Sequence, residues 1–134
     1  MARGSVGAVL FDSPEVPVPQ ILVDHSAELD FDRTAFADEV HKAITEVIDT
    51  TVDHCKTLFR PAAHHRVGDG TTGEAAVLVE IKILAGRTAE QRAELTDRIL
   101  TILCSRITRP AALGVQVTEL DRDTYRFVHH PGTH

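Results

Sequence analysis

The chain of 134 residues has few aromatic residues, no tryptophan and only two cysteines. Aromatic side chains make up 4% of the sequence, which leaves no stacking platform for single-stranded nucleic acid. Cys55 and Cys104 are too few and too far apart for a disulfide framework or a CxxC metal site. We therefore expect both thiols to be reduced, with Cys104 buried on a helix.

Long apolar runs and an excess of positive charge are also missing. No run approaches the roughly 20 apolar residues that cross a bilayer, and the start of the chain lacks the pattern of a signal peptide. Fourteen Lys and Arg against twenty Asp and Glu give a formal charge of −6, which disfavours nucleic acid and anionic membranes as partners. We expect a cytoplasmic protein that holds any anionic ligand with a local cluster of cations.

The composition that is present, 43% hydrophobic and 25% charged, is typical of one globular domain. Prolines at positions 14, 17 and 19 favour extended chain over helix. We expect an N-terminal extension over residues 1–18, a folded domain over residues 19–128 and a short tail over residues 129–134.

The first half of the domain contains a strand, a helix and a less regular strand. The apolar run Ile21–Val23 follows Pro19 and predicts a buried strand. Asp32 is a suitable N-cap for a helix whose apolar residues recur on one face. A second strand is expected over residues 57–67, interrupted near Pro61.

The second half repeats this order. After a glycine-rich turn at residues 68–73, alternating apolar residues predict a strand over Ala75–Leu84. Thr88 and Gln91 form a capping box that begins a helix, which Arg109-Pro110 stops. A final strand is expected over Val115–Leu120.

Two strand-helix-strand units predict an α+β fold with duplicated βαβ units, in which two helices cover one face of a mixed four-stranded sheet. Both faces of the strand Ala75–Leu84 are largely apolar. We therefore expect neighbouring subunits of a symmetric oligomer to cover the face that the helices leave open.

Several ordered motifs resemble one known family. These are Pro19–Asp24 followed by His25-Ser26-Ala27-Glu28-Leu29, the turn Arg66–Gly70, the strand-to-helix junction Ile83–Thr88, and the closing strand Val115–Leu120. Together they resemble the 5-carboxymethyl-2-hydroxymuconate isomerases of the tautomerase superfamily. The likeness extends to about residue 127, which leaves only the extension and the tail outside it.

The resemblance implies a homotrimeric isomerase of aromatic catabolism that needs no metal and no cofactor. In such enzymes an N-terminal proline takes a proton from a dienol, and the proton returns to a carbon further along the conjugated system. The substrate is a small conjugated dicarboxylate, whose carboxylates are held by arginines. Carried over to this sequence, Pro19 matches the catalytic proline, and Arg60 and Arg87 are the expected carboxylate partners.

The sequence departs from the family pattern at Gln20, His25 and Glu28. Glu28 adds a negative charge to a motif that, in the family, lies near an anionic substrate. More importantly, Pro19 is internal, and a prolyl amide has no lone pair for proton transfer. Initiation at Val18 from a GTG codon, followed by removal of that residue, would free the amine. The alternative is a non-catalytic oligomeric module that binds small molecules and has lost its base.

The two arginines and the histidine pairs also have simpler interpretations. Arg87 could pair with Glu90 or Glu94 on the surface, and Arg60 could be solvated. The pairs at positions 64–65 and 129–130 do not predict a metal site, because adjacent histidines on a strand point to opposite faces.

Overall fold

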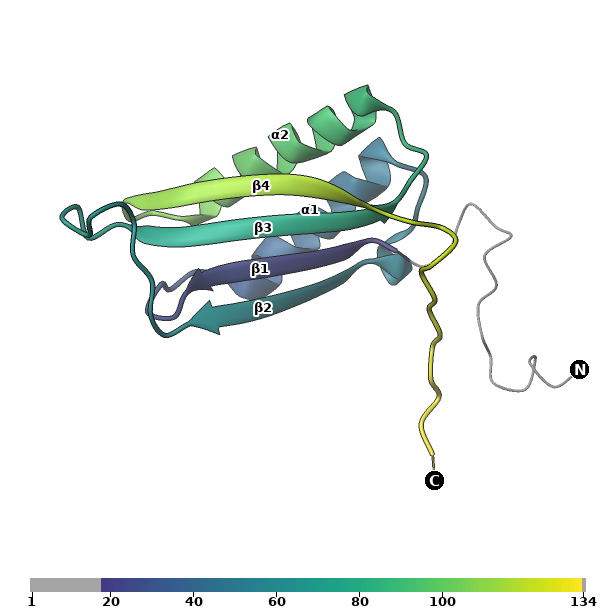
Figure 1. Cartoon of the computed structure of the whole chain (residues 1–134), viewed down its shortest axis with the longest axis horizontal. Coiled ribbons are helices and arrows are strands. Elements are labelled where there is room, and N and C mark those ends of the chain that lie inside the picture. Colours follow the sequence, from purple (N-terminus) through teal and green to yellow (C-terminus); the bar gives the residue numbers. More distant parts are fainter. Residues whose placement is uncertain (1–17, 134) are drawn as a thin grey trace, which may run out of the picture.

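A computed structural model describes residues 18–133, in which two helices pack against one face of a four-stranded sheet (Figure 1). In chain order the elements are β1 (Gln20–Ser26), α1 (Arg33–Val47), the 3-10 helix η2 (Val52–His54), β2 (Lys56–Ala62), β3 (Ala75–Leu84), α2 (Ala89–Arg106) and β4 (Ala111–Leu120). The expected N-terminal extension, apart from its last residue, lies outside the described residues.

The strand order is β2-β1-β3-β4. β1 pairs with β2 in parallel and β3 pairs with β4 in parallel, whereas β1 and β3 are antiparallel in the centre. Each parallel pair is connected through a helix, so the sheet consists of two βαβ halves. This confirms the predicted α+β fold with two helices on one face of a mixed sheet.

Both helices begin at the predicted caps. The Asp32 carboxylate accepts a hydrogen bond from the Ala35 amide at 2.9 Å. Thr88 Oγ1 accepts from the Gln91 amide at 3.0 Å, while the Thr88 amide donates to Gln91 Oε1 at 3.0 Å, which completes a capping box. α2 ends at Arg106, earlier than Pro110 requires.

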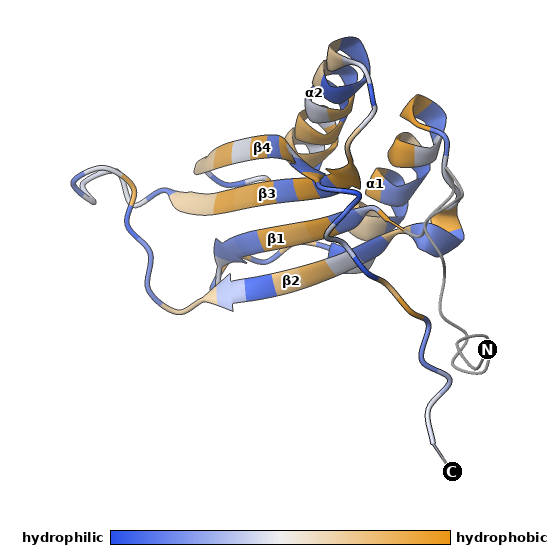
Figure 2. Ribbon diagram, turned by 45° about the vertical axis from the view of Figure 1, so that its right-hand side comes forward, coloured by the Kyte–Doolittle hydropathy of each residue, from blue (hydrophilic) through white to orange (hydrophobic). Residues whose placement is uncertain are grey.

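The core lies between the sheet and the helices, because alternate residues of each central strand point toward α1 and α2. Figure 2 shows the hydrophobic residues that run along β1 and β3, with a hydrophilic end to β1. On the opposite, open face of the sheet, Leu58 and Leu78 remain 61% and 59% exposed. An apolar open face of this kind fits the expectation that other subunits cover it.

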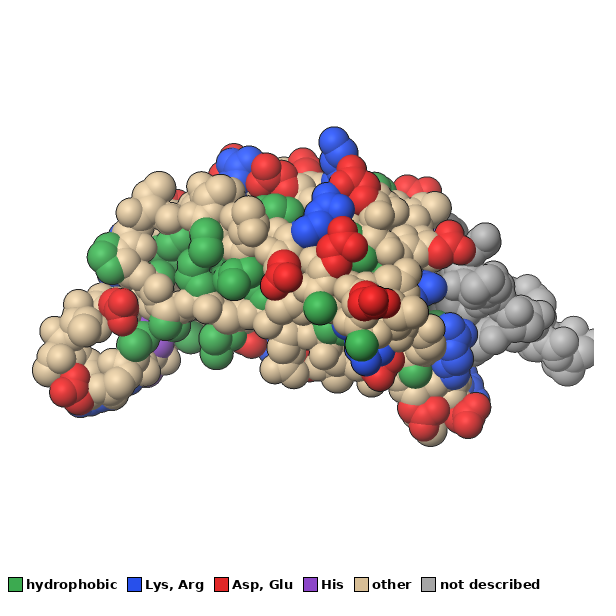
Figure 3. Space-filling model, turned by 90° about the horizontal axis from the view of Figure 1, so that it is seen from above, with side chains coloured by type: hydrophobic (Ala, Val, Ile, Leu, Met, Phe, Trp, Pro, Cys, Tyr) green, Lys and Arg blue, Asp and Glu red, His purple; other side chains and the backbone are tan. Residues whose placement is uncertain are grey.

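The edge of the sheet at β4 is also apolar. Ala111, Leu113 and Val115 are half-buried against the core. Figure 3 looks onto this side and shows apolar side chains gathered over one half of it, with acidic and basic side chains interleaved elsewhere.

Four local expectations differ from the structure. The second strand, expected over residues 57–67, ends at Ala62. Pro61 lies within β2 instead of interrupting it, because an edge strand tolerates a missing N–H. β4 begins four residues earlier than Val115, at Ala111. The prediction that Cys104 is buried is wrong: Cys104 is exposed and Cys55 is buried. Leu103 occupies the core-facing position, and one further helical residue turns Cys104 away from it.

Among residues 18–133, no helix is both long enough and apolar enough to cross a membrane.

Candidate functional site

Pro19 is buried at the start of β1, at one end of the sheet. Its carbonyl accepts a hydrogen bond from the Lys56 amide at 3.2 Å, which starts the pairing of β1 with β2. Val18 is 6% exposed, and its carbonyl accepts from Thr50 Oγ1 at 3.3 Å. The peptide unit before Pro19 is therefore packed into the structure.

A cleft of about 330 Å³ lies beside Pro19, on the open face of β1 and β2. It is lined by Gln20, Leu22, Lys56 and Leu58. In the parallel register Gln20 is opposite Lys56 and Leu22 is opposite Leu58, so the two polar side chains lie at the Pro19 end and the leucines beyond them. An ammonium and an amide next to an apolar floor can hold a carboxylate that carries a short hydrocarbon chain.

Lys56 is the cation that the structure adds to the predicted site. Its Nζ donates to the His54 carbonyl at 2.6 Å and lies 4.4 Å from the centre of the Phe127 ring. Burial lowers the pKa of Lys56. Sequence reasoning missed this residue because only the register of β2 against β1 brings it to Gln20, and no local motif marks that register.

Arg87 lies at the same end of the sheet as Pro19. β3 runs antiparallel to β1, so β3 ends where β1 begins, and Arg87 is the third residue after Leu84, the last residue of β3. It is half-buried, and its Nη2 donates to the Asp49 carbonyl at 3.3 Å. Its Nε is buried without a hydrogen-bond partner. Within residues 18–133 it forms no ion pair, so neither Glu90 nor Glu94 neutralises it.

Arg60 lies near the other end of β2. Its Nε and Nη2 both donate to the Asp24 carboxylate at 2.8 Å, so a bidentate ion pair occupies the guanidinium. Four residues of strand separate Arg60 from Lys56, which is about 13 Å. Within one protomer, the structure therefore brings Arg87 and Lys56 to the end of the sheet that carries Pro19, but not Arg60.

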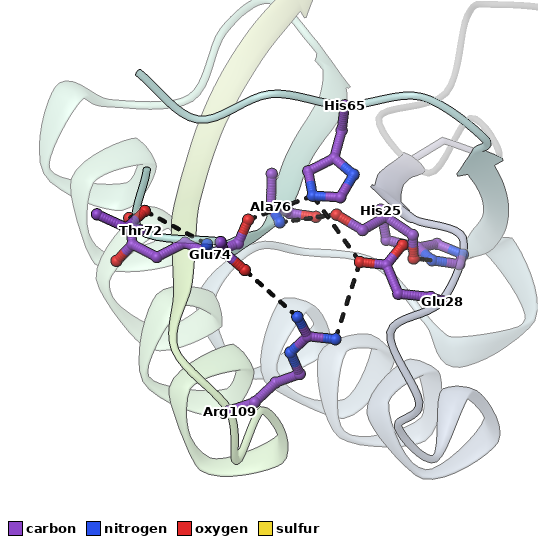
Figure 4. A network of polar contacts seen from close by, with 9 residues as sticks. His25, Glu28, His65, Thr72, Glu74, Ala76 and Arg109 are labelled. Carbon is purple, nitrogen blue, oxygen red and sulfur yellow. Dashed lines mark hydrogen bonds and ion pairs between the residues drawn. The ribbon is translucent and has the colours of Figure 1, made fainter. Parts of the chain in front are cut away.

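A second polar cluster occupies the end of the sheet opposite Pro19 (Figure 4). Glu28 Oε2 lies 3.8 Å from His65 Nε2 and 3.8 Å from Arg109 Nη1. His65 Nε2 is 3.2 Å from the Glu74 carbonyl, and Arg109 Nη2 donates to the Gly73 carbonyl at 3.5 Å. Glu28 thus connects its own loop after β1 with the loop between β2 and β3 and the loop between α2 and β4. Within a protomer, the Glu28 carboxylate lies far from Pro19.

His25 also departs from the family pattern, and its side chain is in the core. It is 1% exposed, its Nδ1 lies 2.9 Å from the Ser26 carbonyl, and its ring packs edge-on against Phe31 and Phe59. Nε2 is buried without a hydrogen-bond partner. Because residues alternate along β1, His25 faces the helices while Gln20 and Leu22 line the cleft on the open side.

The described residues contain no group of three or more histidine, cysteine, aspartate or glutamate side chains placed to hold a metal ion. The histidine pair at positions 64–65 contributes only His65 to the cluster around Glu28.

This chain is similar to known proteins in its three-dimensional structure, but its sequence has no match. No protein-family model matches the sequence, and no curated protein matches it.

Three solved structures show what the fold is similar to. A 5-carboxymethyl-2-hydroxymuconate isomerase from Deinococcus radiodurans R1 aligns with 84% of this chain and 89% of its own, at 15% identity and a TM-score of 0.69. A macrophage migration inhibitory factor-like protein from Entamoeba histolytica aligns over 84% and 96%, at 21% identity and a TM-score of 0.65. A fused 4-OT protein, described as a symmetric trimer, aligns over 76% and 85%, at 18% identity and a TM-score of 0.65. The chain therefore shares the α+β fold of these solved structures.

Proposed function

We propose that the chain is a cofactor-independent tautomerase that converts a small conjugated dienol dicarboxylate to its oxo tautomer, as in 5-carboxymethyl-2-hydroxymuconate isomerisation in aromatic catabolism. The observation that carries the proposal is a proline at the start of β1, next to a cleft that combines an ammonium group with an apolar floor. Solved structures of the same fold include isomerases and a decarboxylase, which supports an enzymatic role.

In the proposed reaction, the amine of Pro19 acts as the base. An α-amine has an ordinary pKa of about 7.7 to 8.0, and nearby cations lower it, so it suits proton transfer near neutral pH. The amine takes the proton of the enol hydroxyl as the C=O bond forms and the double bonds shift. It then returns the proton to a carbon at the far end of the conjugated system, so no atom is gained or lost.

Three cations are the candidate partners of the substrate carboxylates in this proposal. Lys56 and Arg87 come from the same protomer as Pro19. Arg60 contributes only if a second subunit brings it to the cleft and the substrate competes with Asp24 for it.

The amine exists only if the bond between Val18 and Pro19 is absent from the mature protein. Removal of Val18 would leave the Thr50 hydroxyl, which now donates to the Val18 carbonyl, next to the new amine. Intact mass of protein expressed from the native gene tests this point. A mass that begins at Pro19 supports the base, and a mass of all 134 residues contradicts it.

Activity is tested separately, with protein that starts at Pro19, the full-length chain and Pro19→Ala in a dienol-to-ketone absorbance assay. We expect turnover only from the chain that starts at Pro19. If it does not exceed Pro19→Ala on 5-carboxymethyl-2-hydroxymuconate and shorter dienol dicarboxylates, the enzymatic proposal is wrong.

The second candidate is a non-catalytic oligomeric module that binds small molecules. It is favoured by the packing of the peptide unit before Pro19, since Val18 is almost completely buried and its carbonyl is hydrogen-bonded. Binding of dicarboxylates by the full-length chain without turnover would support this module.

For either function, we propose a homotrimer in which neighbouring subunits cover Leu78 and the part of the open face that lies outside the cleft. The exposure of Leu78 in the isolated protomer supports an assembly that buries it. The trimeric form of the fused 4-OT protein, which has a similar fold, supports this number of subunits.

A further inference from the structure

The two polar side chains of the cleft are both held by the segment that follows β4, residues 121–128. Gln20 Nε2 donates to the Tyr125 hydroxyl at 2.8 Å. Lys56 Nζ lies over the Phe127 ring, 4.4 Å from its centre. One aromatic side chain of this segment therefore contacts each polar residue that lines the cleft.

The backbone of this segment is fixed by a turn at its start. The Asp121 carboxylate accepts from the Asp123 amide at 2.9 Å, and the Asp121 carbonyl accepts from the Tyr125 amide at 3.0 Å. Arg122 Nε donates to the Ala85 carbonyl at 2.9 Å, which ties the turn to the end of β3. The position of Tyr125 is thus set by the body of the protein.

Tyr125 is anchored in a small apolar cluster with Val18, Leu84 and Leu120. Burial raises the pKa of its hydroxyl, which therefore stays protonated at neutral pH. Phe127 follows two residues later, a spacing that puts both side chains on one side of an extended chain. Gln20 and Lys56 lie opposite each other on neighbouring strands, so Tyr125 and Phe127 can each contact one of them.

Neither aromatic residue lines the cleft itself, whose walls are Gln20, Leu22, Lys56 and Leu58. Tyr125 and Phe127 therefore contact the two polar residues from outside the cleft and do not fill the space that a ligand would take. A lysine side chain has many rotamers, and a ring against its ammonium restricts them before a ligand arrives. A preorganised ammonium binds a carboxylate more tightly than a mobile one.

We propose that Tyr125 and Phe127 are positioning residues that hold Gln20 and Lys56 in the orientation needed to bind a carboxylate with a short apolar chain. The ligand carboxylate meets the ammonium and the amide, and its chain lies on Leu22 and Leu58. This inference rests on the proposed function for its site, but it concerns binding and does not require a free amine at Pro19.

The test measures dissociation constants of hexanoate and hexan-1-ol for the full-length chain by NMR titration, with Lys56 observed through its side-chain signals. We expect hexanoate to bind wild type better than hexan-1-ol. Phe127→Leu removes the aromatic face but keeps an apolar side chain, so we expect hexanoate binding to weaken about 3- to 10-fold, the range of a partly desolvated cation–π contact. Hexan-1-ol binding should not change.

Two further variants serve as controls. Phe127→Tyr keeps the aromatic face and should bind hexanoate like wild type. Val128→Ala alters the next side chain, which is 44% exposed, and should also leave binding unchanged. The pKa of Lys56 gives a second readout: it should fall further in Phe127→Leu, which removes a contact that favours the charged form, but not in Phe127→Tyr.

The proposal is overturned if hexanoate fails to bind wild type, if Phe127→Leu binds it as wild type does, or if that variant loses both ligands equally. The last result would mean that Phe127 only supports the local structure. If the chain that starts at Pro19 shows no turnover but Phe127→Leu still loses hexanoate binding selectively, the proposed function fails and the positioning role stands. If the chain that starts at Pro19 turns over substrate but Phe127→Leu shows no selective loss of hexanoate binding, the proposed function stands and the positioning role fails.

Discussion

Replacing Leu78 by glutamine should separate the subunits of the proposed homotrimer without unfolding them. Leu78 is 59% exposed and lies over Gly114, where an added Cβ would be 3.2 Å from its Cδ2. Complete burial of a leucine contributes about 1.5 to 3 kcal/mol, so covering the exposed three-fifths contributes about 1 to 2 kcal/mol per copy. A trimer contains three copies, and the loss is therefore about 3 to 6 kcal/mol per trimer.

A loss of this size lowers the association constant of the trimer by about 10²- to 10⁴-fold. Sedimentation velocity over a concentration series should show the midpoint of assembly shifting to higher concentration in Leu78→Gln. Circular dichroism of the dissociated protein should retain the helical signal, because the side chain contributes little to the protomer's own core.

The matched control is Val52→Gln, which changes an apolar residue of similar exposure, 53%, away from the open face. It should assemble like wild type. The reasoning is refuted if Leu78→Gln assembles at wild-type concentrations, or if Val52→Gln dissociates equally, since the open face would then not be the interface.

Three smaller predictions concern the protomer. Burial lowers the pKa of His41 below its ordinary 6.5. The His41 imidazole therefore binds a proton more readily in the unfolded chain than in the folded one, and the free energy of unfolding falls as the pH drops through about 6.5. His41→Gln should flatten that fall in urea denaturation series between about pH 7.5 and pH 5, and an unchanged slope would contradict the assignment. Thr88→Ala should lower the free energy of unfolding by about 1 kcal/mol through loss of the capping box, measured by the same denaturation at neutral pH, and no change would rule out that contribution. Peptide mapping after iodoacetamide treatment near pH 8 should find Cys104 alkylated and Cys55 protected until unfolding, because burial raises the pKa of Cys55 to about 11; equal labelling in the folded protein would show that Cys55 is accessible.

The parts of the structure that short-range signals determine were predictable from the sequence. Asp32 and the pair Thr88 and Gln91 mark helix starts through hydrogen bonds that span three residues, and both were predicted correctly. The alternation in Ala75–Leu84 likewise gave the bounds of β3, since a strand in the middle of a sheet must bury side chains at every second position.

The candidate site depends on strand register, which no local signal in this sequence fixes. Arg60 and Lys56 lie four residues apart on the same face of β2, and sequence reasoning chose the first as a ligand-binding cation. The structure pairs Arg60 with Asp24 and places Lys56 opposite Gln20, so the cation nearer Pro19 is the one that the sequence did not indicate. The contacts of Tyr125 and Phe127 could not be predicted from local signals either, because they join residues 105 and 71 positions apart in the chain.

The sheet order has a practical consequence for handling the protein. β1 starts and β4 ends at the same end of the sheet, so the described chain enters at Val18 and leaves after Leu120 beside the cleft. An affinity tag or a surface linkage at either of these points would crowd that cleft. The exposed turn at residues 68–73 lies at the opposite end, where three glycines with positive φ already accommodate an irregular backbone. A label or immobilisation group inserted there would leave the cleft facing solution.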